Sequence, residues 1–176
     1  MLINDVDWSY YGPLIHESEE LVESFGIEIP EFISYDIVKS DRKWGDWSLK
    51  DGCHYIRVAK RLLDTGNDHA IKETLIHEIL HACYPHEGHR KGWKRAAKLI
   101  SDSTDYHISR LSSEDDKGIQ EDEINWMFKI ECTGCGTRWF YTKPKNVRAI
   151  VKGRCMCSKC KGKKFKVINK FGEEVK

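Results

Sequence analysis

The segment from His77 to His89 concentrates side chains that bind metal ions. It has the sequence HEILHACYPHEGH and holds four of the chain's eight histidines together with two glutamates. On an α-helix, His77 and His81 lie one turn apart and project from the same face, which suits two ligands of one zinc ion. Glu78 follows His77 by about 100° of helical rotation. That position lets Glu78 act as a general base on water at the zinc.

A catalytic zinc also needs a third protein ligand and an open position for water. Three side chains after the motif are candidates: His86, Glu87 and His89. His86 comes directly after Pro85, close to the point where the chain leaves the predicted helix. His89 follows a glycine, and seven residues separate it from His81, so the chain has room to turn back. The alternative to a metal site is a pair of hydrogen-bonded histidines in the core or at the surface.

Four cysteines predict a second metal site near the end of the sequence. They form two Cys-x2-Cys pairs separated by twenty-one residues, Cys132 with Cys135 and Cys157 with Cys160. This spacing fits two zinc knuckles that close one tetrahedral four-thiolate site. Cys155 lies two residues before Cys157 and could replace it as a ligand. Seven cysteines, an odd number, fit a disulfide framework poorly and metal-bound thiolates in a reducing compartment better.

The spacing of apolar residues predicts a helix that carries the histidine motif. From Asn67 or Asp68 to about Tyr84, apolar residues recur at helical spacings behind an Asn/Asp cap, and Pro85 ends the pattern. Two further helices are predicted over residues 15–26 and 92–103. Stretches rich in β-branched and aromatic residues at 31–40 and 53–63, separated by a turn-rich connection at 41–52, predict two or three short antiparallel strands.

The chain divides by charge. Residues 126–176 hold fourteen lysines and arginines against three acidic residues, a balance of +11, whereas residues 1–125 have a balance of −10. The polar and acidic stretch between the ordered parts predicts a linker. We therefore expect a domain with the histidine motif over residues 1–108, an acidic linker over 109–125 and a basic four-cysteine zinc ribbon over 126–176.

The basic ribbon predicts binding to a polyanion, most simply DNA, either single- or double-stranded. Aromatic rings interleave with the cations and could stack on unpaired bases while the cations meet phosphate. The candidate DNA-binding residues are Lys143, Lys145, Arg148, Lys152, Arg154 and Trp139. The alternative is that the charge only keeps a small domain soluble and that the rings pack its core.

The residues HEILHACYPHEGHRKGW resemble the SprT-like (SprT/Spartan-like) zinc metallopeptidase family. In that family a His-Glu-x-x-His motif is paired with a later Gly-His that opens a helix with an aromatic residue, and here these are Gly88, His89 and Trp93. The resemblance extends to WGDWSLKDGCHYIRVAKRLL before the motif and to the four-cysteine ribbon after it. It implies an α+β fold, in which a zincin-like (SprT-like) metalloprotease domain with a short antiparallel sheet and the HExxH helix precedes a small four-cysteine zinc ribbon.

The same resemblance implies the functional residues. His77, His81 and His89 bind a catalytic zinc, and Glu78 activates the water that attacks the peptide bond. We expect a zinc metalloendopeptidase of DNA repair that cleaves DNA-associated or DNA-crosslinked proteins, with one catalytic and one structural Zn²⁺. The alternative is a non-proteolytic nucleic-acid-binding regulator in which both zinc sites are structural.

A protease must also hold its substrate extended. The alternating segment around Tyr55, Ile56 and Arg57 is predicted to be an edge strand that binds the peptide by strand addition, although an ordinary sheet strand fits equally well. Candidates for an oxyanion-stabilising residue are His86, Tyr84 and Tyr106.

The sequence has no recognisable targeting or membrane signal. Its first residues lack the basic and apolar regions of a signal peptide, and no apolar run is long enough to span a bilayer. We therefore expect an intracellular protein, in the cytoplasm or at the nucleoid or nucleus, that is not secreted, is monomeric and has no membrane partner.

Overall fold

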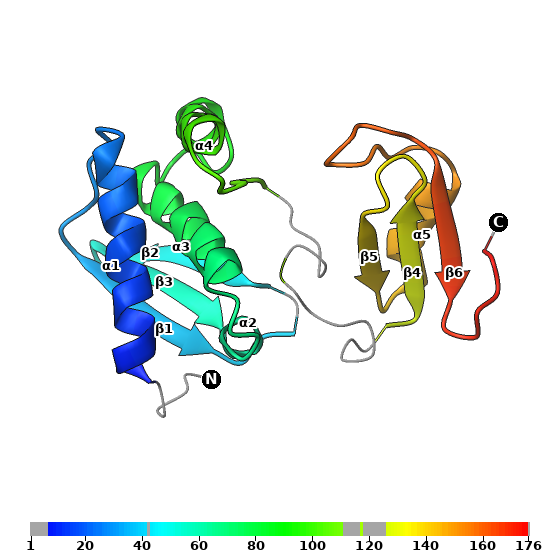
Figure 1. Ribbon diagram of the computed structural model, residues 1–176, viewed down its shortest axis with the longest axis horizontal. Helices are drawn as coiled ribbons and strands as arrows, with labels where there is room; N and C mark the ends of the chain where they lie inside the picture. Colours follow the sequence, from blue (N-terminus) through cyan, green and yellow to red (C-terminus); the bar gives the residue numbers. More distant parts are fainter. Residues whose placement is uncertain (1–6, 42, 111–116, 118–125, 176) are drawn as a thin grey trace. The chain divides into compact units, whose positions relative to one another are not determined.

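The structure is a computed structural model that describes residues 7–41, 43–110, 117 and 126–175. The chain divides into two compact units, Met1–Arg110 and Leu111–Lys176 (Figure 1). Each unit has its own sheet, its own hydrophobic cluster and, among its described residues, a group of side chains that could hold a metal ion. Most of the predicted linker, residues 111–116 and 118–125, lies outside the described residues.

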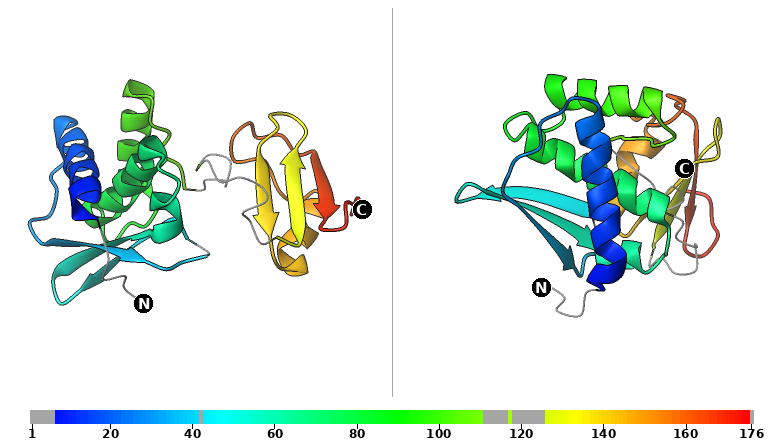
Figure 2. Two further views of the ribbon diagram at one scale, coloured as in Figure 1. Left: turned by 60° about the horizontal axis from the view of Figure 1, so that its bottom comes forward. Right: turned by 60° about the vertical axis from the view of Figure 1, so that its left-hand side comes forward.

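The first unit is a three-stranded sheet with helices packed over one face (Figure 2). Its elements in chain order are α1 (Trp8–Ser24), β1 (Ile33–Val38), β2 (Gly45–Lys50), β3 (Cys53–Ala59), α2 (Lys60–Leu63), α3 (Asp68–Cys83) and α4 (Lys91–Ser103). Helix α3 begins where the Asn67 side chain accepts a hydrogen bond from the Ala70 amide at 3.1 Å, as a cap residue does. In the part of the chain that the structure describes, no helix is long and apolar enough to cross a membrane.

Strand β3 lies in the middle of this sheet, between β1 and β2. β2 pairs antiparallel with β3 across a turn at Asp51 and Gly52, whose φ angles of 51° and 78° suit a two-residue hairpin. β1 pairs parallel with β3. The prediction of an antiparallel sheet is therefore wrong for β1, because the chain crosses to the far edge to form β2 and returns through the hairpin into the centre. The connection over residues 41–52, predicted as turns, contains β2.

The central position of β3 contradicts the predicted substrate strand. Both edges of β3 are hydrogen-bonded, one to β1 and the other to β2, so neither is free to bind a peptide. Ile56 is fully buried, whereas Tyr55 and Arg57 alternate onto the opposite face of the sheet. Arg57 donates a hydrogen bond to Asp46 at 2.6 Å. The prediction that Tyr55, Ile56 and Arg57 form a substrate-binding edge strand is therefore wrong.

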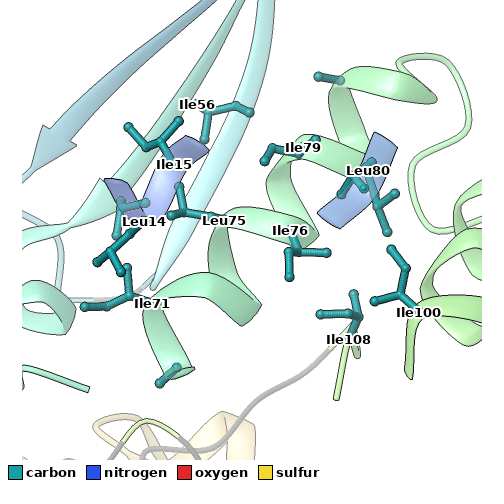
Figure 3. Close-up of a cluster of buried hydrophobic side chains, with 14 of the residues drawn as sticks. Leu14, Ile15, Ile56, Ile71, Leu75, Ile76, Ile79, Leu80, Ile100 and Ile108 are labelled. Atoms are coloured by element: carbon teal, nitrogen blue, oxygen red, sulfur yellow. The ribbon is translucent and has the colours of Figure 1, made fainter. Parts of the chain in front are cut away.

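Helix α3 is buried on two sides and is thereby fixed in place. Figure 3 shows Ile71 and Leu75 of α3 near Leu14 of α1. Leu80 of α3 lies in the other part of the same cluster, which also contains Ile100 of α4. These five side chains are at most 5% exposed. Each buried leucine or isoleucine contributes about 1.5–3 kcal/mol to stability. The core therefore fixes the directions in which the remaining side chains of α3 point.

The second unit is a small antiparallel sheet with one helix. Its elements are β4 (Phe128–Cys132), β5 (Arg138–Tyr141), α5 (Pro144–Val151) and β6 (Phe165–Asn169). β4 lies between β5 and β6 and pairs antiparallel with both. Among the residues described there, the buried cluster consists of Ile130, Val147 and Val167. So small a cluster stabilises a module of this size only weakly, which is the usual situation in domains that need a metal to fold.

Candidate metal centres

Three histidines meet at one point in the first unit. The Nε2 atoms of His77, His81 and His89 lie 3.1–3.2 Å from one another. His77 and His81 come from adjacent turns of α3, and His89 comes from the loop that leads into α4. Of the three candidates for a third ligand, the structure thus brings His89 to the pair. His86 is exposed and lies outside this group, and the Glu87 carboxylate binds the first turn of α4.

The triangle of nitrogens fits a zinc ion. Imidazoles bound to tetrahedral zinc at about 2.0–2.1 Å would place their nitrogens roughly 3.3–3.4 Å apart, close to the separation seen here. Metal-binding imidazoles must also be unprotonated. Burial, together with the charge of His89, lowers the pKa of His81 to about 4. Burial also lowers the pKa of His89, and the positive charges of Arg110 and Lys94 add to this effect. Both imidazoles therefore present lone pairs at neutral pH.

Neighbouring groups orient the three imidazoles. Nδ1 of His77 lies 2.9 Å from the carbonyl oxygen of Ser109, so Nδ1 carries the donated proton and Nε2 keeps its lone pair for a metal. Trp93 of α4 contacts all three histidine rings at centroid distances of 4.5–5.5 Å. Trp47 of β2 stacks on His81 at 6.1 Å. The sequence does not reveal the roles of Ser109 and Trp47, since a carbonyl contact has no sequence signature and the residue types at 41–52 predict turns where β2 forms.

The loop that carries His89 is shaped by its neighbours in the chain. Gly88 has a φ angle of 53°, which glycine adopts without strain. The Glu87 carboxylate accepts a hydrogen bond from the Gly92 amide at the N-terminal end of α4, where negative charge is favoured. A Cβ atom at Gly92 would come within 2.8 Å of that carboxylate. The position of His89 is therefore tied to the start of α4.

The environment of Glu78 raises the pKa of its carboxyl group. Its side chain is only 7% exposed, and it has no hydrogen-bond partner among the described residues. Burial raises the pKa of Glu78 to about 8, with a smaller contribution from Asp46 that Lys43 opposes. A nearly buried carboxyl group without a partner costs stability, and such groups concentrate at functional sites. The positive charge of a metal ion at the histidines would favour the ionised form and lower this pKa.

Gly45 of β2 makes room for Glu78. A Cβ atom built on Gly45 would lie 2.8 Å from Cγ2 of Thr74 and 3.0 Å from both Cγ and Oε1 of Glu78. Thr74 and Glu78 both belong to α3, which the core holds in place. Because the core holds α3, a larger residue at position 45 must displace the Glu78 side chain, the Thr74 side chain or β2 itself.

Among the described residues, the histidine group fills three of the four positions of a tetrahedral metal site. Within the described residues it contains three donors, so a metal held there has a position available for water. Among the suggested oxyanion-stabilising residues, Tyr106 stacks on His69, with the two ring centroids 4.6 Å apart. His69 lies on α3 about two helical turns before His77. Tyr84 is the C-terminal cap residue of α3. Tyr106 is therefore poorly placed for that role.

Four sulfur atoms meet in the second unit. The Sγ atoms of Cys132, Cys135, Cys157 and Cys160 all lie within 4.8 Å of one another. Between the two pairs, the Sγ atoms of Cys132 and Cys160 lie 3.4 Å apart, and those of Cys135 and Cys157 lie 3.5 Å apart. Cys157 rather than Cys155 belongs to this group. Four thiolates in such an arrangement could hold one metal ion, and they are the usual donor set of a structural zinc.

The residues predicted to bind DNA occupy two different environments. The cations are exposed on α5 or directly beside it: Lys143, Lys145, Arg148, Lys152 and Arg154. Trp139, by contrast, is half-buried and packs against the hydrophobic cluster, with its ring 6.2 Å from that of Phe165. The ring of Trp139 is therefore engaged in the core of this unit.

The opposite face of the same sheet carries a second group of rings. Phe140 follows Trp139 along β5 and so points to the other face, where its ring lies 6.1 Å from that of Trp126. Lys129 is the partner of Phe140 in the sheet, and its Nζ atom lies 5.8 Å from the centroid of the Trp126 ring. Two rings beside an ammonium group form a set that can stack on unpaired bases.

Comparison with known proteins gives a family for the first unit. The model of the SprT-like family matches residues 19–112, a span that includes the three histidines and Glu78. Human germ cell nuclear acidic protein is 31% identical to this chain over 113 residues, which is 61% of the chain and 14% of that protein. The chain thus spans a small part of the length of this relative.

Proposed function

The chain belongs to the SprT-like family, and we propose that it is a zinc metalloendopeptidase. In this proposal the three histidines hold the catalytic zinc, Glu78 is the base, and the four cysteines hold a structural zinc. The observation that carries it is a triangle of imidazole nitrogens on the same helix as a nearly buried carboxyl group without a hydrogen-bond partner among the described residues. A regulator with a structural zinc would close this site with a fourth protein ligand, whereas the described residues supply three.

The proposed mechanism assigns the proton transfers to Glu78. A zinc ion, when bound, supplies a Lewis acid that polarises the scissile carbonyl and activates water. Glu78 accepts the proton of the attacking water and then delivers it to the leaving amine. The carbonyl of Ser109 keeps His77 in the tautomer that binds metal, and Trp93 covers the histidine rings on the side of α4.

We infer that the substrate lies along the outer edge of β2, with which no other described strand pairs. β2 is an edge strand of the sheet, unlike β3. Its Gly45 lies against Glu78, and its Trp47 stacks on His81. An extended peptide that added to this edge through main-chain hydrogen bonds would bring its scissile bond beside the base and the metal ligands.

The close approach of Gly45 to Glu78 gives a prediction that can be tested without changing any of the three histidines. Gly45→Ala should lower kcat by about tenfold to a hundredfold, because a displacement of the base by about 1 Å is enough for such a loss. Zinc content, measured by mass spectrometry, should not change. Gly12→Ala is the control, since a Cβ atom at Gly12 meets nothing within 4 Å. An unchanged kcat in Gly45→Ala would show that catalysis does not need the carboxyl group held against β2.

The protease proposal is tested by digestion of a DNA-binding protein with the zinc-loaded full chain. We expect fragments to appear, 1,10-phenanthroline to stop their formation, and added zinc to restore it. If no fragments form with zinc present and with the substrate unfolded, the chain is not an endopeptidase.

The charge of the second unit supports a further part of the proposal, that DNA brings the enzyme to proteins bound or crosslinked to it. The exposed cations on and beside α5 can meet phosphates, and Trp126 with Phe140 can stack on unpaired bases. Digestion of the same substrate should therefore be faster when it is bound to DNA. An equal rate of digestion with and without DNA would contradict the proposal that DNA recruits the enzyme, but it would not contradict the peptidase assignment.

For DNA binding itself we expect a steep dependence on salt. Each phosphate contact adds about 0.7–0.9 to the slope of log K against log salt. The double variant Lys145→Gln with Arg148→Gln should weaken binding to a labelled oligonucleotide and reduce that slope by about 1.4–1.8. Lys60→Gln, which changes a lysine of the first unit paired with Asp64, should leave the slope unchanged. Equal slopes for all three proteins would show that α5 does not bind the backbone.

A further inference from the structure

A cavity of about 400 Å³ adjoins the histidine group, and the mechanism above makes no use of it. One wall is α4, and the other is the segment 107–110. The cavity reaches His89 directly, and it includes Ser109, whose carbonyl oxygen contacts His77. Its volume is in the range of pockets that bind ligands. A group in this cavity would therefore lie next to one candidate metal ligand, His89, and next to Ser109, which contacts a second.

The lining of the cavity is apolar at its base and cationic at its mouth. Trp93, Ala97 and Ile108 form the base and are at most 7% exposed. Lys94 and Arg110 also line the cavity, and both are exposed. This combination suits a side chain with an apolar stem and a charged end.

The charge at the mouth is positive on balance. Lys98 and Asp102 also line the cavity, but they form an ion pair with each other. Within the described residues, Lys94 and Arg110 have no acidic partner. Both line the cavity together with His89. A negatively charged group would find two cations available beside the metal ligand.

We propose that this cavity is a specificity subsite that takes an acidic side chain of the protein substrate next to the scissile bond, a proposal that rests on the endopeptidase function above. Glutamate fits the lining, since its methylene groups can cover Trp93 and Ile108 while its carboxylate accepts hydrogen bonds from Lys94 and Arg110. Lysine or arginine at the same substrate position is repelled by these cations. The subsite therefore selects where an exposed substrate segment is cut.

The proposal is tested first on the unmodified protein. The zinc-loaded full chain digests a peptide library in which one position at a time is Glu, Gln or Lys, and the cleavage sites are read by mass spectrometry. We expect Glu to exceed Gln by about fivefold to tenfold in kcat/KM at one position flanking the cut, as two partly exposed charge contacts would give. The preference should shrink as salt is raised.

A binding measurement separates recognition from turnover. Fluorescent peptides that carry Glu, Gln or Lys at the selected position are titrated into the Glu78→Gln protein, and polarisation is measured. We expect the same order of affinity, with Glu tightest. The double variant Lys94→Glu with Arg110→Glu should reverse the order in favour of Lys. Arg95→Glu is the matched control, because Arg95 is exposed on α4 but does not line the cavity.

The results that would contradict the proposal differ in what they overturn, the subsite alone or the endopeptidase function as well. Cleavage without preference at any flanking position overturns the subsite and leaves the endopeptidase intact, whereas no cleavage and no peptide binding removes both. An effect of Arg95→Glu as large as that of the double variant overturns the subsite in favour of a general electrostatic field. If the double variant loses affinity for a ten-nucleotide oligothymidine but keeps the peptide preference, the cavity binds phosphate instead. Because the first test uses the unmodified protein, poor folding of a variant leaves the proposal testable.

Discussion

Glu78→Gln is expected to keep its zinc and to lose about 10²–10⁴-fold in kcat, the range that positioned proton transfer supplies. The amide has nearly the shape of the carboxyl group, but it cannot accept the proton of the attacking water. Glu78 has no hydrogen-bond partner among the described residues, so the substitution breaks no bond that supports the fold there. The loss should therefore fall on the chemical step and leave the metal site and the fold unchanged.

The measurement compares single-turnover cleavage, zinc content and melting temperature in the same preparation. Glu73→Gln is the matched control, because Glu73 lies on the same helix and its Oε1 accepts a hydrogen bond from the His107 amide that glutamine can also accept. Wild-type cleavage by Glu78→Gln would falsify the assignment of Glu78 as the base. Loss of zinc from Glu78→Gln would instead mean that this carboxyl group binds the metal.

The second large effect concerns the four-cysteine group. Cys132→Ser should release one zinc ion and unfold the second unit, while the first unit keeps its structure. A structural zinc contributes about 10–16 kcal/mol in small zinc modules, far more than a cluster of Ile130, Val147 and Val167 can replace. The first unit has its own extensive core and does not depend on this metal for its hydrophobic burial.

Hydrogen exchange followed by mass spectrometry distinguishes the two units in the full chain. Peptides from β4, β5 and β6 should lose protection in Cys132→Ser, and peptides from α3 should keep it. Cys155→Ser is the control, since Cys155 is outside the group of four sulfurs and its loss should release no zinc. Zinc loss from Cys155→Ser, with retention in Cys157→Ser, would reverse the choice between these two cysteines.

The features predicted well from the sequence are those that depend on residues close together in the chain. The range of α3 follows from helical spacing and the Asn67 cap, and the structure places it at Asp68–Cys83. The convergence of His77 with His81 follows from one turn of helix. Bringing in His89 required only a turn of seven residues, which Gly88 makes possible with a positive φ angle.

The features that were missed depend on pairing across long distances. Periodicity along β3 shows that one face is buried, but it does not show that β1 runs parallel to it or that both of its edges are occupied. Trp139 and Phe140 are neighbours in the sequence, yet one packs in the core and the other lies on the opposite face, a choice set by the register with β4. The contact between the Ser109 carbonyl oxygen and His77 depends on the path of the chain after α4. The residue type at position 109 does not indicate this contact.

The contact of Trp93 with all three histidine rings links two equilibria, the docking of α4 and the binding of the metal. His89 is tied to α4 a second time, through the hydrogen bond between Glu87 and Gly92. Whatever free energy the metal adds to the docked position of α4, a docked α4 must add to metal affinity, because such couplings are reciprocal. A partner that pulls α4 away from α3 would therefore weaken metal binding without touching a ligand, and loss of the metal would loosen this helix.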